Sequence, residues 1–281
     1  MNHEVISPYL CPLCRQQLIS KERVYQCNAG HSFDVAKAGY VNLLPVHFKN
    51  SSVPGDNKAM LAARRAFLEA DYYAPMAQSI ASLLTNECCH HHQTIKILDI
   101  GCGEGYYDRV LNQRLQCDQS VEWHGVDIAK LAITAAAKKL PSVRYCVASN
   151  HALPYQDAYF DVLLRIFAPS NEIELKRVLN SHGKLLIVTP GPKHLSQLKA
   201  FVYKEVRDHA ENISVPNGFK ARHVERISYQ ISPSQQQRSA LLQMTPFAWK
   251  INKAQQEALL TVKQLIIDVD FIITLADYAK I

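Results

Sequence analysis

Short apolar runs alternate with amphipathic stretches between residues 95 and 190 of this chain. A run of about four to eight mostly apolar residues indicates a buried strand, and apolar positions that recur every three or four residues indicate a helix. The expected strands cover residues 95–100, 121–128, 143–149, 159–169 and 184–190. The expected helices between them cover residues 106–116, 129–140 and 170–179. This alternation predicts an α/β domain with a doubly wound, mostly parallel sheet.

The pattern of apolar residues is different before residue 95 and after residue 190. Apolar residues at helical spacing between residues 59 and about 84 are interrupted by the segment EADYYAP, so two helices are expected there. After about residue 196 the periodicity is weaker. It predicts a helix, a strand, a helix and a final strand, which cover, in that order, residues 195–206, 224–231, 233–243 and 269–278. Residues 1–36 show little apolar periodicity, and residues 37–58 are rich in Gly, Pro, Asn and Ser, as in a loop or linker.

Composition restricts the class of protein. The chain has 281 residues, of which 48% are hydrophobic and 20% charged, as in globular proteins. We see no apolar run of the roughly 18 residues that a membrane helix needs and no secretory signal, so we expect a cytoplasmic protein without a membrane partner. In a reducing compartment its eight cysteines are expected to be thiols or metal ligands rather than disulfides.

The charge is unevenly distributed. The net charge is +6, and residues 1–65 carry eight Lys and Arg against four Asp and Glu, which accounts for +4 of it. This excess is consistent either with an anionic partner near the N-terminal part or with a solvated basic face.

Three cysteines and one histidine near the start have the spacing of a metal site. The pattern is Cys11-x2-Cys14-x12-Cys27-x3-His31. Each pair is close enough in sequence for one tight turn to direct both side chains at one ion, and the alternation in residues 15–26 predicts a hairpin between the pairs. Thiolates combined with an imidazole favour zinc, and four protein ligands leave no open coordination position. The site is therefore expected to be structural.

A second Cys and His cluster occupies residues 88–92. Adjacent side chains point in different directions and rarely share an ion, so we interpret this segment as a surface loop. The sequence thus predicts a zinc-binding finger at residues 1–36, a linker at 37–58 and a second domain at 59–281.

The segment ILDIGCGEGYY, residues 97–107, places three glycines directly after a predicted strand and before a helix. Glycines there let the backbone turn sharply and approach a ligand, and the helix N-terminus offers free N–H groups. Asp99 precedes the glycines, where it would repel a pyrophosphate, and Asp127 ends the next strand, where it can accept hydrogen bonds from ribose hydroxyls. This arrangement favours S-adenosylmethionine, which has an ammonium group and no phosphate. A nicotinamide or flavin dinucleotide, and a tight turn without a ligand, are the alternatives.

Several motifs of the chain resemble those of known families. LDIGCGEG and GVDIAK resemble the first two motifs of class I S-adenosylmethionine-dependent methyltransferases. The finger, together with FDVAKAGYVNLLPV, PGD, ARRAFLEADYYAP, VASNHALPY, TPGPKHL and LLQMTPFAW, resembles the RlmA (RrmA) family of 23S rRNA (guanine-N1)-methyltransferases. The resemblance implies a Rossmann-like methyltransferase domain with an extra antiparallel strand near its end, fused to a zinc finger. It also implies methylation of a guanine in a hairpin loop of 23S rRNA by a homodimer.

Candidate site residues follow from the motifs and the resemblance. The candidates for contacts with S-adenosylmethionine are Tyr73, Asp99, Gly101, Cys102, Gly103, Glu104, Asp127, Ser149, Asn150, His151 and His194. Within this set, residues 101–104 are expected at the methionine part and residues 149–151 at the adenine. The candidates for the acceptor pocket are Phe167 and Pro169. Packing roles for Tyr73 and Phe167 and a helix cap at His194 are the alternatives, and no residue is identified as the base that removes the guanine N1 proton.

Candidates for phosphate contacts, each of which is alternatively a solvated charge, are Arg15, Lys21, Arg23, Lys37, Arg64 and Arg65. Two other functions stay open at this stage. One is a methyltransferase for a small quinone or phenol, although such a substrate needs no finger. The other is a zinc-finger RNA-binding protein with a vestigial cofactor fold, although Asp99, Asp127 and the glycines are intact. The sequence does not identify which guanine is modified.

Overall fold

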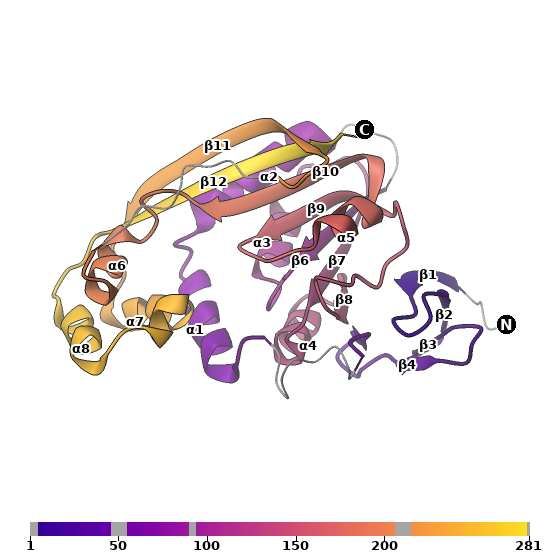
Figure 1. Ribbon diagram of the computed structural model, residues 1–281, viewed down its shortest axis with the longest axis horizontal. Coiled ribbons are helices and arrows are strands. Elements are labelled where there is room, and N and C mark those ends of the chain that lie inside the picture. The colour runs from indigo at the N-terminus through magenta and orange to yellow at the C-terminus, as the bar shows by residue number, and fades with distance from the viewer. Residues whose placement is uncertain (1–4, 46–54, 90–93, 206–214, 280–281) are drawn as a thin grey trace.

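The computed structural model describes residues 5–45, 55–89, 94–205 and 215–279 (Figure 1). The described residues form an eight-stranded sheet flanked by helices and a four-stranded sheet built from the N-terminal residues. The α/β class and the N-terminal finger that the sequence predicts are both confirmed.

The centre of the large sheet is parallel. Its strands are β6 (Ile95–Ile100), β7 (Val121–Asp127), β8 (Arg144–Val147), β9 (Phe160–Ile166) and β10 (Leu179–Pro190). They lie in the order β10-β9-β6-β7-β8, so β6 and β9 are neighbours although they are far apart in the chain. The chain continues from β6 to β7, toward one edge of the sheet, and from β9 to β10, toward the other edge. The carboxyl ends of β6 and β9 therefore border the crevice in which ligands of doubly wound sheets bind.

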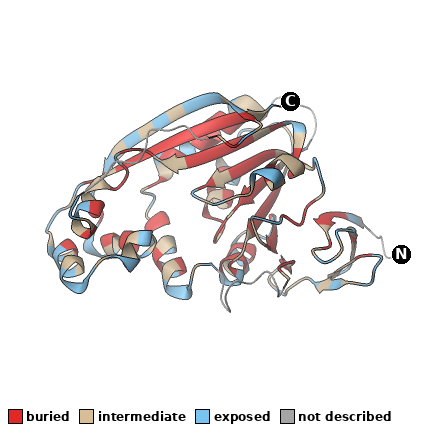
Figure 2. Ribbon diagram, in the orientation of Figure 1, coloured by how far each residue is buried: buried red, intermediate tan, exposed pale blue. Residues whose placement is uncertain are grey.

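The C-terminal part of the sheet is antiparallel. β12 (Ile267–Tyr278) lies between β10 and β11 (Phe219–Ile231) and runs antiparallel to both. This confirms the antiparallel strand that the resemblance implies. β11 begins before the predicted range 224–231 because its first residues pair with the end of β12. β12 is buried along most of its length, whereas the edge strand β11 exposes alternate residues (Figure 2).

Helices connect the strands and cover one end of the sheet. Those of the strand–helix alternation are α3 (Tyr106–Arg114), α4 (Lys130–Lys139) and α5 (Glu172–Val178). The predicted helix break at EADYYAP separates α1 (Lys58–Leu68) from α2 (Ala74–Cys88). The helices α6 (Ser196–Val202), α7 (Gln235–Gln243) and α8 (Lys253–Thr261) gather with α1 near the carboxyl ends of the strands, together with the 3-10 helix η2 (Pro246–Trp249) (Figure 1). None of the helices in these described parts of the chain is long and apolar enough to cross a bilayer.

Three of these elements depart from the sequence-based expectation. α6 is shorter than the predicted range 195–206, whose last residue lies outside the described residues. α8 and η2 correspond to no predicted element, because their short apolar patterns are not distinctive.

Side-chain caps fix the starts of α1 and α7. Asn57 accepts a hydrogen bond from the Met60 N–H on α1 (3.0 Å), and Ser234 and Gln237 form a capping box on α7.

The finger is an antiparallel sheet of β1 (Val5–Leu10), β2 (Gln17–Lys21), β3 (Val24–Gln26) and β4 (Ser32–Asp34). β2 and β3 form the predicted hairpin, with Lys21 opposite Val24. Because β1 and β3 both run antiparallel to β2, they end at the same end of the sheet. The turns after β1 and after β3, which carry the two ligand pairs, are therefore brought together.

The finger packs firmly on the large sheet. Tyr9 of β1 is 1% exposed and its ring lies 5.2 Å from that of Tyr155, which is fully buried in the loop between β8 and β9. The same segments are joined by backbone hydrogen bonds from Leu10 N to Pro154 O (3.0 Å) and from Gln156 N to Pro8 O (3.1 Å). One apolar cluster thus continues from the finger into the large domain.

The segment predicted as a linker is partly built into the large sheet. Within it, β5 (Val41–Asn42) pairs in parallel with β8 and forms the edge strand. Two residues are too short a run to be recognised as a strand from periodicity alone. Residues 46–54 of the expected linker lie outside the described residues.

The expectation that no cysteine forms a disulfide is wrong for one pair. Cys89, directly after α2, and Cys117, shortly after α3, are joined by a disulfide with their Cα atoms 5.1 Å apart. Gln116 N donates to Thr85 Oγ1 (3.2 Å), so the loop after α3 lies against the end of α2 and brings the two cysteines together. The other six cysteines are free. Of the predicted surface loop at 88–92, His90, His91 and His92 lie outside the described residues.

Substitution Tyr9→Ala tests the joint between the finger and the large domain. Because the side chain is completely buried across this joint, we expect a loss of unfolding free energy of roughly 3–5 kcal/mol, the range for large buried aromatic residues. Urea denaturation measures the change. Ile6→Ala is the matched control, since Ile6 lies on the same strand with 73% of its surface exposed and should change stability by less than about 0.5 kcal/mol. Equal effects of the two substitutions would contradict the described packing.

Candidate functional site

The finger brings its four predicted ligands to one point. The ligand atoms of Cys11, Cys14, Cys27 and His31 all lie within 4.8 Å of one another. Cys14 Sγ is 3.6 Å from Cys27 Sγ, and His31 Nδ1 is 3.4 Å from Cys27 Sγ. Two thiolates bound to a tetrahedral zinc ion lie roughly 3.8 Å apart, so the donor set and its spacing fit zinc. All four positions come from the protein, which fits a structural ion.

A cavity of about 540 Å³ opens beside the carboxyl ends of β6 and β9. The residues predicted to contact the cofactor or the acceptor that line it are Tyr73, Asp99, Gly101, Cys102, Gly103, Glu104, Phe167 and His194. The predicted residues that do not line it are Asp127, Ser149, Asn150, His151 and Pro169. No finger residue contributes to this lining, so the finger and the cavity are separate features of the described chain.

Asp127 fixes the glycine loop. Its Oδ2 accepts a hydrogen bond from Gly103 N (3.0 Å), and its Oδ1 accepts one from Ala129 N (2.8 Å). Gly101 has a φ of +76°, and a Cβ at this position would lie 2.6 Å from Ala168 Cβ, so only glycine fits. Each carboxylate oxygen of Asp127 keeps a second lone pair. The residue can therefore hold the loop and still accept from a ligand hydroxyl.

Two buried carboxyl groups lie behind this loop. Asp99, in β6, and Asp108, in α3, are 2% and 0% exposed and interact with each other electrostatically. Tyr145 OH donates to Asp108 Oδ2 (2.8 Å). Asp99 Oδ2 and Asp108 Oδ1 have no hydrogen-bond partner among the described residues. Burial raises the pKa of Asp99 above its usual range and that of Asp108 to about 7.

This acid pair fits a cationic ligand. Asp99 lines the cavity, and its buried oxygen lacks a donor from the described chain. An uncompensated carboxylate in a buried position is costly, and a nearby positive charge offsets that cost. The ammonium group of S-adenosylmethionine has the required charge and hydrogen atoms. The dinucleotide alternative, with its pyrophosphate, does not.

The loop after β8 reaches the same crevice from the side. Ser149 Oγ accepts from His151 N (3.2 Å), and Asn150 Nδ2 donates to Pro169 O (3.2 Å). Asn150 Nδ2 also lies 3.4 Å from where a Gly101 Cβ would be. The loops after β6, β8 and β9 therefore meet, although residues 149–151 stay outside the cavity lining. Pro169 is exposed, and its carbonyl oxygen holds Asn150.

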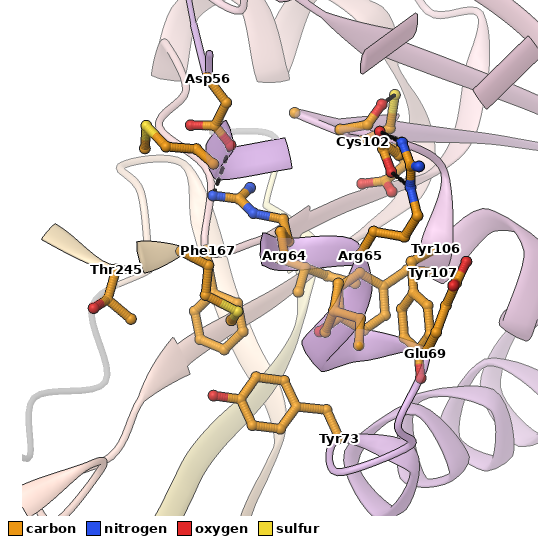
Figure 3. A pocket seen from close by; sticks show the side chains of 18 of the residues that line it. Asp56, Arg64, Arg65, Glu69, Tyr73, Cys102, Tyr106, Tyr107, Phe167 and Thr245 are labelled. Carbon is orange, nitrogen blue, oxygen red and sulfur yellow. Dashed lines mark hydrogen bonds and ion pairs between the residues drawn. The ribbon is translucent and has the colours of Figure 1, made fainter. Parts of the chain in front are cut away.

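Aromatic rings form another wall of the cavity (Figure 3). Tyr73 and His194 each lie 4.9 Å from the ring of Phe271, and the His194 Nδ1 accepts from Asp270 N (3.2 Å). His194 is therefore held by the backbone of β12 rather than acting as a helix cap. Phe167 stacks on His194 with ring centroids 6.2 Å apart, yet remains 44% exposed, so it is not a core residue.

Two arginines of α1, Arg64 and Arg65, line part of the cavity. Their position at the cavity was not predicted from the sequence. Arg65 donates to both carboxylate oxygens of Glu104, from Nε at 2.7 Å, and Arg64 pairs with Asp56 at 2.8 Å. Figure 3 shows the second pair at the cavity. Both arginines were predicted as phosphate contacts, and their pairing within the chain reduces the charge they offer to RNA. The residues of the segment 244–249 that line the cavity were also missed, since they belong to a region without a clear pattern.

Similarity to known proteins covers both parts of the chain. Residues 9–52 match the family model described as RlmA, N-terminal, a zinc ribbon, and residues 91–257 match the family model described as methyltransferase domain. The Bacillus subtilis protein YxjB, which carries the provisional name of a 23S rRNA (guanine-N1)-methyltransferase, is 31% identical over 95% of this chain and 96% of its own.

Two further relatives come from Streptomyces and Micromonospora. A 23S rRNA (guanine(748)-N1)-methyltransferase of Streptomyces fradiae is 35% identical over 75% of this chain and 74% of its own. A Micromonospora griseorubida protein, with a provisional name as a 23S rRNA (guanine-N1)-methyltransferase, is 30% identical over 99% of this chain and all of its own.

The acid pair predicts a specific pH dependence of stability. Because burial raises the pKa of Asp108, the folded protein holds a proton that the unfolded chain has lost between about pH 4 and pH 7. The unfolding free energy should therefore fall as pH rises through this window, by about 1.4 kcal/mol per unit of pKa difference. Asp108→Asn should flatten this dependence, as measured by urea denaturation at a series of pH values. Asp118→Asn, at an exposed aspartate after α3, should leave it unchanged, and an unaltered slope in Asp108→Asn would refute the raised pKa of Asp108.

Proposed function

We propose that this chain, which belongs to the 23S rRNA (guanine-N1)-methyltransferase family, transfers a methyl group from S-adenosylmethionine to N1 of a guanine in a hairpin loop of 23S rRNA. The observation that carries the proposal is the cavity at the carboxyl ends of β6 and β9, where a buried carboxyl group without a donor lies under a glycine loop. The family relatives give the substrate class. The proposal also includes a homodimer and a cytoplasmic location.

The cofactor is assigned to the part of the cavity formed by the glycine loop. Gly101, Cys102 and Gly103 would follow its methionine part, and Asp99 would bind the ammonium group. Glu104 is already paired with Arg65, so it would fix the end of the glycine loop rather than bind the ligand by itself. Asp127 would accept from the ribose while it braces the loop, and Ser149, Asn150 and His151 would border the adenine. Tyr73 and His194 would contact the cofactor from the aromatic wall.

The residues of the chain have mainly a positioning role in the reaction. When bound, S-adenosylmethionine supplies a methyl group that its sulfonium has already activated. Holding donor and acceptor in line therefore accounts for much of the expected acceleration. Phe167 would contact the acceptor base, and Pro169 would shape its loop through the hydrogen bond from Asn150. The guanine N1 proton is released as the N1–carbon bond forms, and we assign no residue to its removal.

The finger is assigned to the RNA rather than to the methyl transfer. Arg15 donates to Leu153 O, and Arg23 donates to Val35 O and Ala36 O. These hydrogen bonds position the two guanidinium groups without neutralising their charge. A hairpin loop is a suitable substrate because its bases are turned out of the stack more readily than those of a duplex. The finger would hold such a hairpin by its phosphates.

Incubation of the purified protein with methyl-labelled S-adenosylmethionine and a synthetic 23S rRNA hairpin tests the activity. We expect label in 1-methylguanosine after nuclease digestion, and none when the loop guanines are replaced by adenines. Asp99→Ala should weaken S-adenosylmethionine binding in calorimetry by roughly tenfold or more, the effect of losing one charge-assisted contact. Label transferred to a quinone or phenol but not to the hairpin would support a small-molecule methyltransferase instead. Absence of cofactor binding would support a vestigial fold.

Cys27→Ala tests the role of the metal. The protein as purified, without chelators, should contain one zinc per chain, and the variant should lose that zinc together with its affinity for the hairpin. Its affinity for S-adenosylmethionine should be nearly unchanged, because no finger residue lines the cavity. Cys88→Ala, at a free cysteine outside the finger, is the control. Full zinc content in Cys27→Ala would contradict the ligand set, and normal RNA binding without zinc would reduce the finger to a stabilising element.

A further inference from the structure

The short helix η2 lies at the cavity in a fixed position. Thr245 Oγ1 donates to Leu242 O (2.9 Å) at the end of α7, and Lys250 N donates to Phe247 O (3.0 Å) after the turn. Phe247 packs edge-on against Tyr203, with ring centroids 6.0 Å apart. The segment is thus anchored on both sides, and its side chains are presented from an ordered backbone.

Trp249 ends this helix and combines two properties that rarely occur together. It lines the cavity, yet 73% of its surface is exposed. A large aromatic ring exposed to water at an ordered position indicates a binding partner, because its apolar area gains from being covered. Ile6 and Ile173 are equally exposed, but neither of them lines the cavity. The second tryptophan, Trp123 in β7, is 3% exposed and belongs to the core.

The cavity has two chemically different parts. Asp99 and the glycine loop give one part a buried carboxyl group and a backbone that a ligand can approach closely, and the proposed function places the cofactor there. Phe167 and Trp249 give the other part exposed aromatic faces, which come from the loop after β9 and from η2. Phe167 adopts a φ of +55°, a conformation unusual for a non-glycine residue, and this backbone presents its ring at the cavity. A flat aromatic acceptor is the ligand that such faces accommodate.

We propose that Trp249 is the stacking platform for the acceptor guanine, with Phe167 as a second apolar contact to the same base. The proposal rests on the proposed function and adds the purine-binding subsite to it. Stacking holds the base by its faces and leaves the N1 edge free to face the methyl donor. Because every base has an aromatic face, Trp249 would contribute affinity and orientation, and the choice of guanine would depend on other contacts.

Tryptophan fluorescence provides a direct test. Trp123→Phe leaves Trp249 as the only tryptophan in the chain, and this variant is first checked for methyl transfer. The probe is the synthetic 23S rRNA hairpin, added to protein saturated with S-adenosylhomocysteine. We expect quenching of Trp249 by the hairpin, and loss of the quenching for one of a set of hairpins in which each loop guanine is replaced in turn by an abasic site. Equal quenching by every hairpin of the set, or none by a hairpin that is methylated, would overturn the proposal.

Kinetics of Trp249 variants give an independent readout. Trp249→Ala should raise KM for the hairpin roughly tenfold to hundredfold, the effect of losing one base stack, while the Kd for S-adenosylmethionine stays the same. Trp249→Phe should restore most of the affinity, which a purely structural role would not predict. Ile173→Ala, at an equally exposed residue away from the cavity, should behave as the unaltered protein.

The outcomes separate this proposal from the proposed function. An unaltered chain that binds S-adenosylmethionine but methylates no RNA would refute the proposed function. A Trp249→Ala protein that methylates the hairpin with an unchanged KM would refute the stacking role alone. If that variant instead changes the sedimentation behaviour of the protein without changing RNA kinetics, Trp249 belongs to an interface between copies of the chain, and the stacking role is again refuted.

Discussion

The burial of carboxyl groups at the carboxyl edge of the parallel sheet is the constraint on which the site depends. Asp99, Asp108 and Asp127 lie close together, and burial raises the pKa of each of them. Asp127 is compensated by two backbone N–H groups, and Asp108 by Tyr145. Asp99 Oδ2 has no hydrogen-bond partner among the described residues. A folded chain that keeps such a group beside a cavity is destabilised locally and is stabilised when a cation binds there.

The remaining parts of the molecule are arranged around this edge. The glycine loop can approach a ligand closely because Asp127 holds its backbone, and α1 closes the cavity through Arg65 and Glu104. The 3-10 helix η2, between α7 and α8 in the chain, contributes further residues to the lining of the cavity. The finger attaches elsewhere, through Tyr9 and the loop that contains Tyr155. Metal binding and ligand binding are therefore separated in space. The finger shares one apolar cluster with the large domain, and the buried apolar residues that line the cavity belong to another.

Local sequence patterns were sufficient for the features that depend on neighbouring residues. Apolar runs located β6 to β10, the spacing of Cys11, Cys14, Cys27 and His31 located the metal site, and the glycines located the loop. The short strand β5, the Cys89–Cys117 pair and the ion pair of Arg65 with Glu104 could not be predicted, because each depends on segments that only the fold brings together. Asp108 was missed for the same reason. It looks like an ordinary helical aspartate until the packing of α3 places it against Asp99.

Reverse transcription of 23S rRNA from cells with and without the gene tests the central claim most directly, because a methyl group on guanine N1 blocks base pairing. We predict a strong stop next to one hairpin-loop guanine in cells that carry the gene, absent in cells that lack it and in cells that carry only the Asp99→Ala variant. Identical stop patterns in all three would contradict the assignment of this chain as a 23S rRNA (guanine-N1)-methyltransferase.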